Sequence, residues 1–378
     1  GEDIRTDLVI LDEAHYLSDP ERGVVWEEVL IYLPPRIKLL LLSATISNAN
    51  ELCEWLKEIR GVPNRVVRSD ERPVPLEMLF LFDDGLVVPL LSKRSLSSRV
   101  KKFVGSKGEG RKKRPARPNF GKIIKHLREL DLLPAIFFLK SRSDCDRAIL
   151  TCAPVQSSPE SKSSLQHLID FFLSTYPHLK GHRQMRLLVE SRVASHHGGQ
   201  LPYWKVLIEN IMKKGSLEAI FSTSTVAAGV NFPARTVVLV QSDRYNGREF
   251  IDLSATELHQ MIGRAGRRGK DCIGFGLVIP GLHQDPQLIG DLLSTRPEPI
   301  SSQIHINFSM TLNLLLSHKP SEVKDLLGFS FAAFQEKQSE LTLKKRWERM
   351  LRELDKVLPR GKCDSKDPYE ILEYIQKR

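Results

Sequence analysis

The sequence predicts an α/β fold, with doubly wound parallel sheets followed by a helical region. Two continuous apolar runs near the start, LVILDEA and IKLLLLSAT, are typical of parallel strands that helices cover on both faces. Similar runs recur as PAIFFLKS, LEAIFST and TVVLVQS, with helical periodicity between them. A chain of 378 residues has room for two or three domains, each with its own core. We therefore expect two sheet-containing units in succession.

The first unit is expected at residues 1–75. Both early apolar runs are its strands, and residues 48–59 form a helix that begins at an asparagine cap. RVVR at residues 65–68 begins a further strand. Residues 76–120 follow as a basic linker. Its stretch rich in Ser, Gly and Pro favours a disordered connector, with an ordered RNA-binding arm as the alternative.

The second unit is expected at residues 121–283. The three later apolar runs are its strands, and GFGLVIP at residues 274–280 supplies a late one. Helices are expected at residues 122–130 and 203–213. The spacing of elements stretches over residues 145–190, which predicts an insertion or an extended helical region there.

The last part of the chain has a helical pattern from Ile304 onward. We expect a winged-helix-like region at residues 284–336. A charged helical segment is expected at residues 337–378.

Composition favours a polyanionic partner, because the chain carries a net charge of +10 and has a pI near 9.3. Its five cysteines form no C-x-x-C pair, so neither a zinc site nor a disulfide framework is indicated. Reduced thiols are typical of a cytoplasmic protein. No apolar run reaches membrane-spanning length, and we expect no membrane partner.

Two carboxylates follow the first apolar strand, in LVILDEAH. Open α/β sheets bind ligands at the carboxyl ends of their strands, where Asp12 and Glu13 stand. An aspartate there can hold Mg²⁺ on a nucleotide, and an adjacent glutamate can activate the attacking water. A solvated Asp-Glu at a helix start is the structural alternative. His15 is a candidate for coupling the nucleotide to the second unit.

The next apolar strand ends in Ser43-Ala44-Thr45. Its hydroxyl groups can hydrogen-bond to the neighbouring carboxylates and respond to their position. Because this tripeptide follows one strand–helix–strand step after DEAH, Ser43 and Thr45 are coupling candidates.

A glycine-rich run with arginines, QMIGRAGRRG, lies far downstream. If it begins a helix, Gln260, Arg264 and Arg267 are spaced i, i+4 and i+7 and share one face. The small residues between them allow a phosphate to approach closely. Arg264 and Arg267 are therefore candidates for arginine fingers in nucleotide hydrolysis.

Two further polar segments follow predicted strands. In FSTSTVAAGVNFPA, Thr223 can bind a phosphodiester oxygen, while Gly229 and Asn231 can line the nucleotide side. A plain β–α loop is the structural alternative. In SHHGG, His197 and Gly198 offer donors to a nucleic-acid backbone.

These motifs together resemble superfamily-two DEAD/DEAH-box helicases, specifically the superkiller-like group of DEVH/DEAH RNA helicases. DEAH and SAT match motifs II and III, and PAIFFLKSR matches motif IV. STSTVAAGVNFPA and QMIGRAGRRGKD match motifs V and VI, while ERGVVWEE, RPVPLE, ASHHGGQLP and SFAAFQ are further family-like segments. The resemblance implies two RecA-like motor domains, the first of them partial, with ATP and Mg²⁺ in the cleft and one nucleic-acid strand across their tops.

The resemblance also implies a strand-separating hairpin between motifs V and VI. The two β-rich runs there are joined around Asn246-Gly247, the preferred pair for a type I′ turn. Tyr245 could stack on the last base pair and Arg248 could contact phosphate. A structural hairpin that touches no nucleic acid is the alternative.

The family's earlier motifs, including the P-loop, do not occur in these residues: no G-x-x-x-x-G-K-[ST] is present, and the chain starts at Gly1. We expect a fragment of a longer ATP-dependent helicase, with no ATP hydrolysis by these residues alone. RNA is favoured over DNA as substrate, and protein partners stay open. The alternative is a nucleic-acid-binding scaffold that does not hydrolyse ATP.

Overall fold

The structure, a computed structural model, divides into two compact units. The first comprises Gly1–His15, Ile37–Glu51 and Arg65–Ile300, and the second comprises Tyr16–Arg36, Leu52–Asn64 and Ser301–Arg378. The structure describes residues 6–20, 22–69, 71–93, 95–109, 118–156, 158–223, 233–245, 248–304, 315–316 and 319–357.

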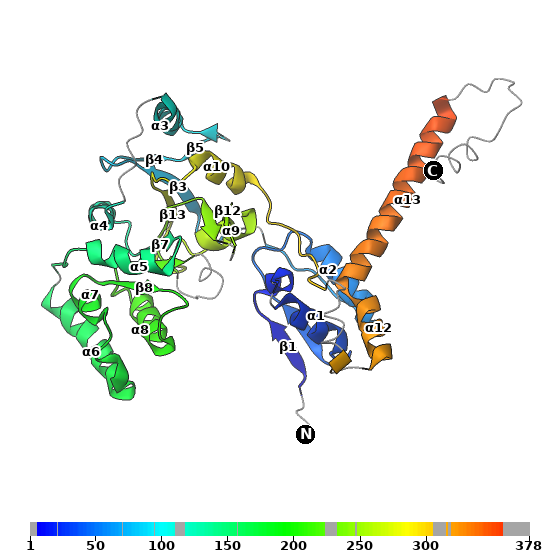
Figure 1. Cartoon of the computed structure of the whole chain (residues 1–378), viewed down its shortest axis with the longest axis horizontal. Helices are drawn as coiled ribbons and strands as arrows, with labels where there is room; N and C mark the ends of the chain where they lie inside the picture. Colours follow the sequence, from blue (N-terminus) through cyan, green and yellow to red (C-terminus); the bar gives the residue numbers. More distant parts are fainter. Residues whose placement is uncertain are drawn as a thin grey trace, which may run out of the picture. The chain divides into compact units, whose positions relative to one another are not determined.

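A seven-stranded sheet forms the centre of the first unit (Figure 1). Its spatial order is β4 (Val87–Pro89), β3 (Leu76–Leu81), β13 (Gly274–Val278), β10 (Thr236–Leu239), β7 (Ala135–Leu139), β9 (Ala219–Thr223) and β8 (Val193–His196). Neighbouring strands pair in parallel, except that β4 pairs with β3 in antiparallel fashion. The predicted doubly wound, RecA-like parallel sheet is therefore confirmed.

Both faces of this sheet are covered by apolar side chains. Along β7, Ile136 and Phe138 belong to one buried cluster, whereas Ala135, Phe137 and Leu139 belong to another. Successive side chains of a strand point to opposite faces, so the two clusters lie on opposite faces of the sheet. This burial explains why the strands read as continuous apolar runs rather than as alternating ones.

Helices pack around the sheet (Figure 1). They are α3 (Ser98–Glu109), α4 (Phe120–Glu129), α5 (Arg142–Ala148), α6 (Pro159–Thr175), α7 (Met185–Glu190), α8 (Pro202–Lys213), α9 (Ala255–Ile262) and α10 (Pro286–Ser294). The helices α6 and α7 account for the stretched spacing predicted at residues 145–190. In the part of the chain that the structure describes, no helix combines the length and apolar character needed to cross a membrane.

The linker predicted at residues 76–120 is wrong over much of its length. Its first strand, β3, pairs with β13 in the sheet, and α3 packs on the same unit. The Phe103 ring of α3 lies 5.7 Å from Phe80 and 5.2 Å from Phe82, measured between ring centroids. The many basic residues of α3 led composition to predict a disordered connector. The segment instead forms an amphipathic helix whose apolar side chains pack on the core of the first unit. The strand predicted at residues 65–68 is also wrong, since those residues form no strand.

A two-stranded parallel sheet carries the first motifs. β1 (Leu8–Leu11) pairs in register with β2 (Lys38–Leu41), so that Leu11 lies opposite Leu41. The helix α2 (Ala49–Arg60) follows β2, close to the predicted range 48–59. This register brings the residues after the two strands to the same edge.

The second unit contains α1 (Gly23–Tyr32), α12 (Pro320–Phe329), α13 (Phe331–Val357) and most of α2. Glu27 of α1 is buried and accepts hydrogen bonds from the Phe331 backbone N–H (2.6 Å) and from Ser302 Oγ (2.8 Å). Burial raises the pKa of this carboxyl group. The contact attaches the start of α13 to α1.

The predictions for the C-terminal part have different outcomes. The charged helix predicted from residue 337 lies within α13 as far as Val357. The winged-helix-like region at residues 284–336 stays a prediction. Its described residues include α10 and α12, while residues 305–314 lie outside the description.

Candidate functional site

The ends of β1 and β2 bring the DEAH and SAT residues together. His15 Nδ1 lies 3.3 Å from Ser43 Oγ and 3.3 Å from Glu13 Oε2. The Ala14 N–H donates to the Leu42 carbonyl at 2.8 Å, which joins the two strand ends through the backbone. The predicted proximity of these motifs is confirmed, while their coupling role stays a prediction.

The conformation of Glu13 is unusual for a residue with a side chain. Its φ is 56°, in the left-handed region that non-glycine residues rarely adopt. Such strain is concentrated at functional sites, where the surrounding structure holds it in place. Here the Glu13 N–H donates to Asp12 Oδ1 at 2.9 Å, a contact that joins the two residues in the strained turn.

The Asp12 side chain is suited to a nucleotide-bound magnesium ion. Asp12 is exposed, and one carboxylate oxygen is engaged by the Glu13 N–H. The described residues hold no group of three or more His, Cys, Asp or Glu side chains placed to bind a metal. A single carboxylate suits Mg²⁺, which keeps its waters and is bound by one or two carboxylates together with substrate phosphates.

Thr45 lies beside this edge and is 5% exposed. Its backbone N–H donates to Ser43 Oγ at 3.3 Å, but its own buried hydroxyl has no hydrogen-bond partner among the described residues. Buried hydroxyl groups normally have a partner. This hydroxyl is therefore available for the coupling role predicted for it.

Only the first part of the motif QMIGRAGRRG is helical, contrary to the prediction that it begins a helix. The helix α9 begins with a capping box formed by Ser254 and Glu257 and ends at Ile262. Gln260 is half-buried in its last turn, but Arg264 and Arg267 follow the helix and share no helical face with it. The predicted helical spacing of the three residues is therefore wrong.

Tertiary contacts end α9 at this point. Ala265 forms a parallel bridge with Ala234, and the Gly266 N–H donates to the Ala234 carbonyl at 2.7 Å. Gly266 has a φ of 88°, which favours glycine, and a Cβ there would lie 2.6 Å from Val74 Cγ1. The chain therefore leaves the helix in a tight turn that presents Arg264.

The two arginines have different partners. Arg264 Nη2 lies 3.5 Å from Glu13 Oε1, within the first unit. Arg267 forms a bidentate pair with Asp271, in which Nε and Nη2 each lie 2.8 Å from a carboxylate oxygen. The structure thus brings Arg264, but not Arg267, to the carboxylates of the first motif.

The Asp271 side chain is 2% exposed, and its charge is stabilised mainly by this pair, with Arg235 Nε as a further cation 3.9 Å from Asp271 Oδ1. Burial acts to raise the pKa of Asp271, but hydrogen bonds from the Arg267 side chain and backbone outweigh it, and the pKa lies below its usual value. Arg267 is consequently held as a structural ion pair.

The residues of motif V that were predicted to line the nucleotide side lie outside the described residues. They are Gly229 and Asn231, within residues 224–232. Thr223 is the last residue of β9 and is 8% exposed. Its predicted phosphodiester contact stays a prediction.

His197 faces inward, contrary to its predicted contact with a nucleic-acid backbone. Its side chain is 3% exposed, and Nε2 lies 3.1 Å from Asp146 Oδ1. Asp146 also accepts from Ser195 Oγ at 2.7 Å and from Gln184 Nε2 at 2.9 Å. Burial acts to raise the pKa of Asp146, but hydrogen bonds from Ser195 and His197 lower it below its usual value. His197 therefore stabilises the loop at residues 197–200 through buried hydrogen bonds to Asp146 and to the Gly199 N–H.

The backbone beside His197 remains accessible. Gly198 and Gly199 are exposed, and a Cβ on Gly198 would lie 3.4 Å from the Arg142 guanidinium. The predicted role of Gly198 in binding a nucleic-acid backbone stays a prediction. Asp146 was missed by sequence reasoning, although a signal existed: it follows a buried strand and a serine cap in SRSDCD.

The hairpin predicted between motifs V and VI is present. β11 (Asp243–Tyr245) pairs in antiparallel fashion with β12 (Phe250–Asp252). Tyr245 lies opposite Phe250, whereas a two-residue turn at Asn246-Gly247 would place it opposite Arg248. Four residues therefore separate the paired ends, and the type I′ turn at Asn246-Gly247 stays a prediction. Residues 246–247 themselves lie outside the description.

A lysine that sequence reasoning missed holds this hairpin on the sheet. Lys140 Nζ lies 2.7 Å from Asp243 Oδ2 and 4.1 Å from the centroid of the Phe250 ring. The Lys140 and Asp243 side chains are 14% and 17% exposed, so their ion pair is largely shielded from water, whereas Phe250 is 55% exposed. At the tip, Tyr245 is 51% exposed and its ring lies 5.3 Å from that of Phe250.

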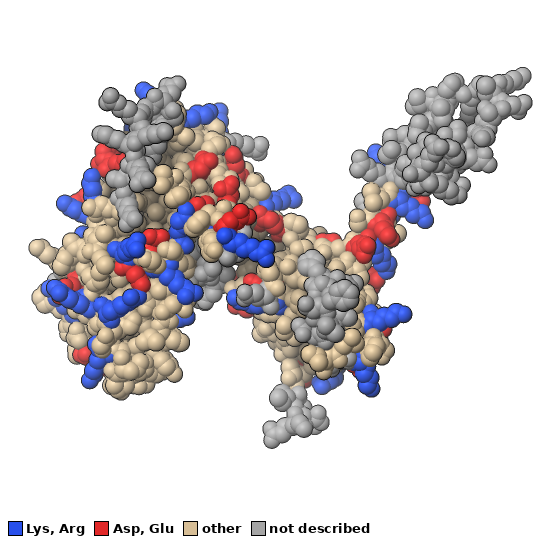
Figure 2. Space-filling model, viewed as in Figure 1, with Lys and Arg blue, Asp and Glu red and all other residues tan. Residues whose placement is uncertain are grey.

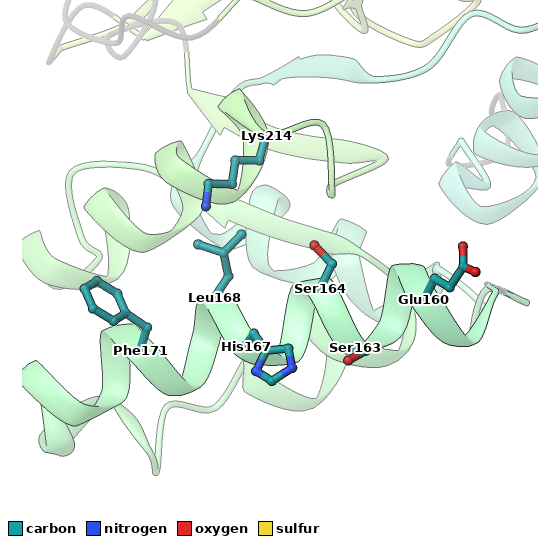
Figure 3. A pocket seen from close by; sticks show the side chains of 7 residues that line it. All are labelled: Glu160, Ser163, Ser164, His167, Leu168, Phe171 and Lys214. Atoms are coloured by element: carbon teal, nitrogen blue, oxygen red, sulfur yellow. The ribbon is translucent and has the colours of Figure 1, made fainter.

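A hollow of about 540 Å³ lies beside α6 and the residue that follows α8, and none of the candidate site residues lines it (Figure 3). It is lined by Glu160, Ser163, Ser164, His167, Leu168, Phe171 and Lys214. As Figure 3 shows, its lining comes mostly from one face of α6, without converging polar groups. The hollow therefore does not mark the reactive site.

Charge by itself does not mark the site either. Figure 2 shows Lys and Arg side chains spread over the visible face of the unit with the seven-stranded sheet, with acidic side chains among them. The net charge of +10 is thus distributed rather than concentrated in this view.

A doubly wound sheet with strand-end carboxylates and an arginine turn defines the RecA-like class of α/β folds. Comparison with known proteins agrees: the DEAD/DEAH box helicase family matches residues 4–52, and the helicase conserved C-terminal domain matches residues 135–269. The chain belongs to the superfamily-two DEAD/DEAH-box helicases, and its relatives are of the superkiller-like group.

Three relatives illustrate this relationship. The probable helicase HelY of Mycobacterium tuberculosis is 34% identical over 399 residues, which cover 98% of this chain and 44% of HelY. The exosome RNA helicase MTR4 of Homo sapiens is 34% identical, covering 81% of this chain and 31% of MTR4. Superkiller complex protein 2 of Homo sapiens is 33% identical, covering 95% and 31%. The chain thus spans less than half the length of these relatives.

Proposed function

We propose that the full-length protein is an ATP-dependent helicase that moves along one strand of RNA and separates duplexes. The observation that carries this proposal is the position of Glu13, whose carboxylate lies 3.3 Å from His15 and 3.5 Å from Arg264. A base and a cation at one point are what hydrolysis of a phosphoanhydride requires. RNA is favoured because MTR4 is named an RNA helicase.

Each residue of the site has a distinct task in this proposal. Glu13 accepts a proton from the attacking water, and Arg264 stabilises charge that develops on the transferred phosphoryl group. Asp12 would hold Mg²⁺, which supplies charge neutralisation at the phosphates when bound. Ser43 contacts His15, so a shift of the carboxylates is transmitted to the second strand end.

The test is to measure ATP hydrolysis by the full-length protein with and without single strands, together with unwinding of matched RNA and DNA duplexes. We expect RNA to stimulate hydrolysis and an RNA duplex to be unwound. Preference for the DNA duplex would identify a DNA helicase instead. Nucleic-acid binding without any hydrolysis would indicate a scaffold and contradict the proposal.

The hairpin is expected to act at the duplex junction. Replacing residues 245–248 by a short neutral turn removes the exposed Tyr245 ring and the Arg248 charge. Unwinding should fall at least about 10-fold, since stacking on a base is worth about 1–3 kcal/mol. ATP hydrolysis stimulated by single strands should persist.

The Tyr245→Phe variant serves as a control because it keeps the ring and should retain unwinding. Equal loss of both activities in the turn replacement would indicate a structural hairpin. Full unwinding would show that the hairpin does not separate strands.

A further inference from the structure

Arg72, which is distant in sequence, forms hydrogen bonds to the turn that contains Arg264. Arg72 Nη2 donates to the Ile262 carbonyl at 3.3 Å and to the Ala265 carbonyl at 3.0 Å. Its Nε donates to the Val74 carbonyl at 3.3 Å, which fixes the guanidinium on its own segment. One nitrogen therefore bridges two carbonyl groups that flank Arg264.

Arg72 adds a charged donor at this turn. Ile262 is the last residue of α9, and its carbonyl already accepts a hydrogen bond from the Ala265 N–H at 3.1 Å. Arg72 supplies a second donor to this carbonyl and a donor to the Ala265 carbonyl, at the point where the chain leaves the helix. A hydrogen bond from a charged donor is worth more than a neutral one, about 1.5–3 kcal/mol.

The packing beside Arg72 restricts the same turn. A Cβ on Gly266 would lie 2.6 Å from Val74 Cγ1, so the segment that carries Arg72 lies directly against the turn. On the other side, the Ala234 N–H donates to the Arg264 carbonyl at 3.0 Å. The backbone of Arg264 is thus held between two segments, and only its side chain extends from the turn.

We propose that Arg72 is a positioning residue for Arg264, because its guanidinium fixes the carbonyls on both sides of that arginine. The inference deepens the proposed function and rests on it for its kinetic consequence. Arg72 itself touches no reacting group. A displacement of about 1 Å at a reacting group can cost about 100-fold in rate, so loosening this turn should be visible in turnover.

The experiment replaces Arg72 by Met, Gln and Lys in the full-length protein. Met keeps the aliphatic stem and removes the donors, and we expect kcat for ATP hydrolysis to fall about 10- to 100-fold. The KM for ATP should change little, because the ground-state contacts remain. Lys places one charged nitrogen near the two carbonyls and should restore most of the rate. Arg65→Met, an exposed arginine on the same segment, is the matched control.

A double variant separates positioning from an independent role. If Arg72 acts through Arg264, then Arg72→Met should cause no further loss in an Arg264→Ala background. An equal additional loss there, or an Arg72→Met enzyme within twofold of wild type, overturns the inference. If Arg72→Met prevents folding, Arg72→Gln replaces it in the comparison with and without Arg264→Ala, and Arg72→Lys shows whether a charged donor restores the rate.

Hydrogen–deuterium exchange tests the clamp without relying on activity. In Arg72→Met, the amides of Ala234 and Gly266, which bond across the turn, should exchange faster than in wild type. Unchanged exchange contradicts the clamp even if the protein hydrolyses ATP. A wild-type protein without ATP hydrolysis, combined with faster exchange in the variant, overturns the proposed function and leaves the clamp standing.

Discussion

Replacing Glu13 by glutamine in the full-length protein is expected to lower the rate of ATP hydrolysis by about 100-fold or more. Glutamine keeps the size of the side chain but cannot accept a proton from water. The φ of 56° is a property of the backbone, and the glutamine amide can still hydrogen-bond to His15, so the variant should fold normally. Hydrolysis should be measured under single-strand saturation, with nucleotide affinity measured separately.

Nucleotide affinity should stay near that of the wild type in this variant, because the base acts in the transition state and not in binding. Glu54→Gln, an exposed glutamate on α2, is the control for loss of one negative charge. Wild-type turnover in Glu13→Gln would remove this residue from the chemistry. A loss of affinity equal to the loss of rate would assign it to binding.

The second large effect is expected at Arg264. Its guanidinium lies 3.5 Å from the Glu13 carboxylate, where it can meet charge on a transferred phosphoryl group. Arginine fingers contribute about 10³–10⁵-fold to turnover in nucleotide hydrolases. Arg264→Ala should therefore lower kcat by about 10³-fold, while single-strand affinity and thermal stability change little. Near-normal turnover would contradict the assignment.

Arg267 provides the contrasting variant. Arg267→Ala leaves the Asp271 carboxylate, which is 2% exposed, without its bidentate partner, so thermal stability should fall. Adding Asp271→Asn should recover part of the melting temperature by removing the unpaired charge. Because the pKa of Asp271 is lowered in the folded state, the pair stabilises the protein above the usual aspartate pKa and loses this effect as the pH falls through the folded value. A loss of kcat without any loss of thermal stability in Arg267→Ala would contradict the structural role of Arg267.

The strands of the seven-stranded sheet were predictable because local pattern and burial agree. In β1 and β2 they do not agree, since Leu8 (47%), Ile10 (54%) and Leu40 (43%) are exposed although both faces were predicted to be covered. A strand such as β7, apolar on both faces, can only be covered on both sides, and polar residues after parallel strands must meet at one edge. The proximity of Glu13, His15 and Ser43 followed from this rule.

The errors share a different physical cause, since each depends on a partner distant in sequence. His197 turns inward because Asp146, on α5, accepts its ring N–H. Helix α9 ends early because Ala265 bridges to Ala234, which no helical periodicity reveals.

The pairing of β3 with β13 has a consequence for synthesis on the ribosome. Leu76 pairs with Gly274, so 198 residues separate the two partners along the chain. At roughly 5–20 residues per second, β13 is made roughly 10–40 s after β3. During that interval Phe80 and Leu81, which are fully or almost fully buried in the folded protein, can pair with β4 but lack a neighbouring strand on the side that β13 will occupy. The nascent chain must therefore keep this segment from premature pairing until residue 278 has emerged.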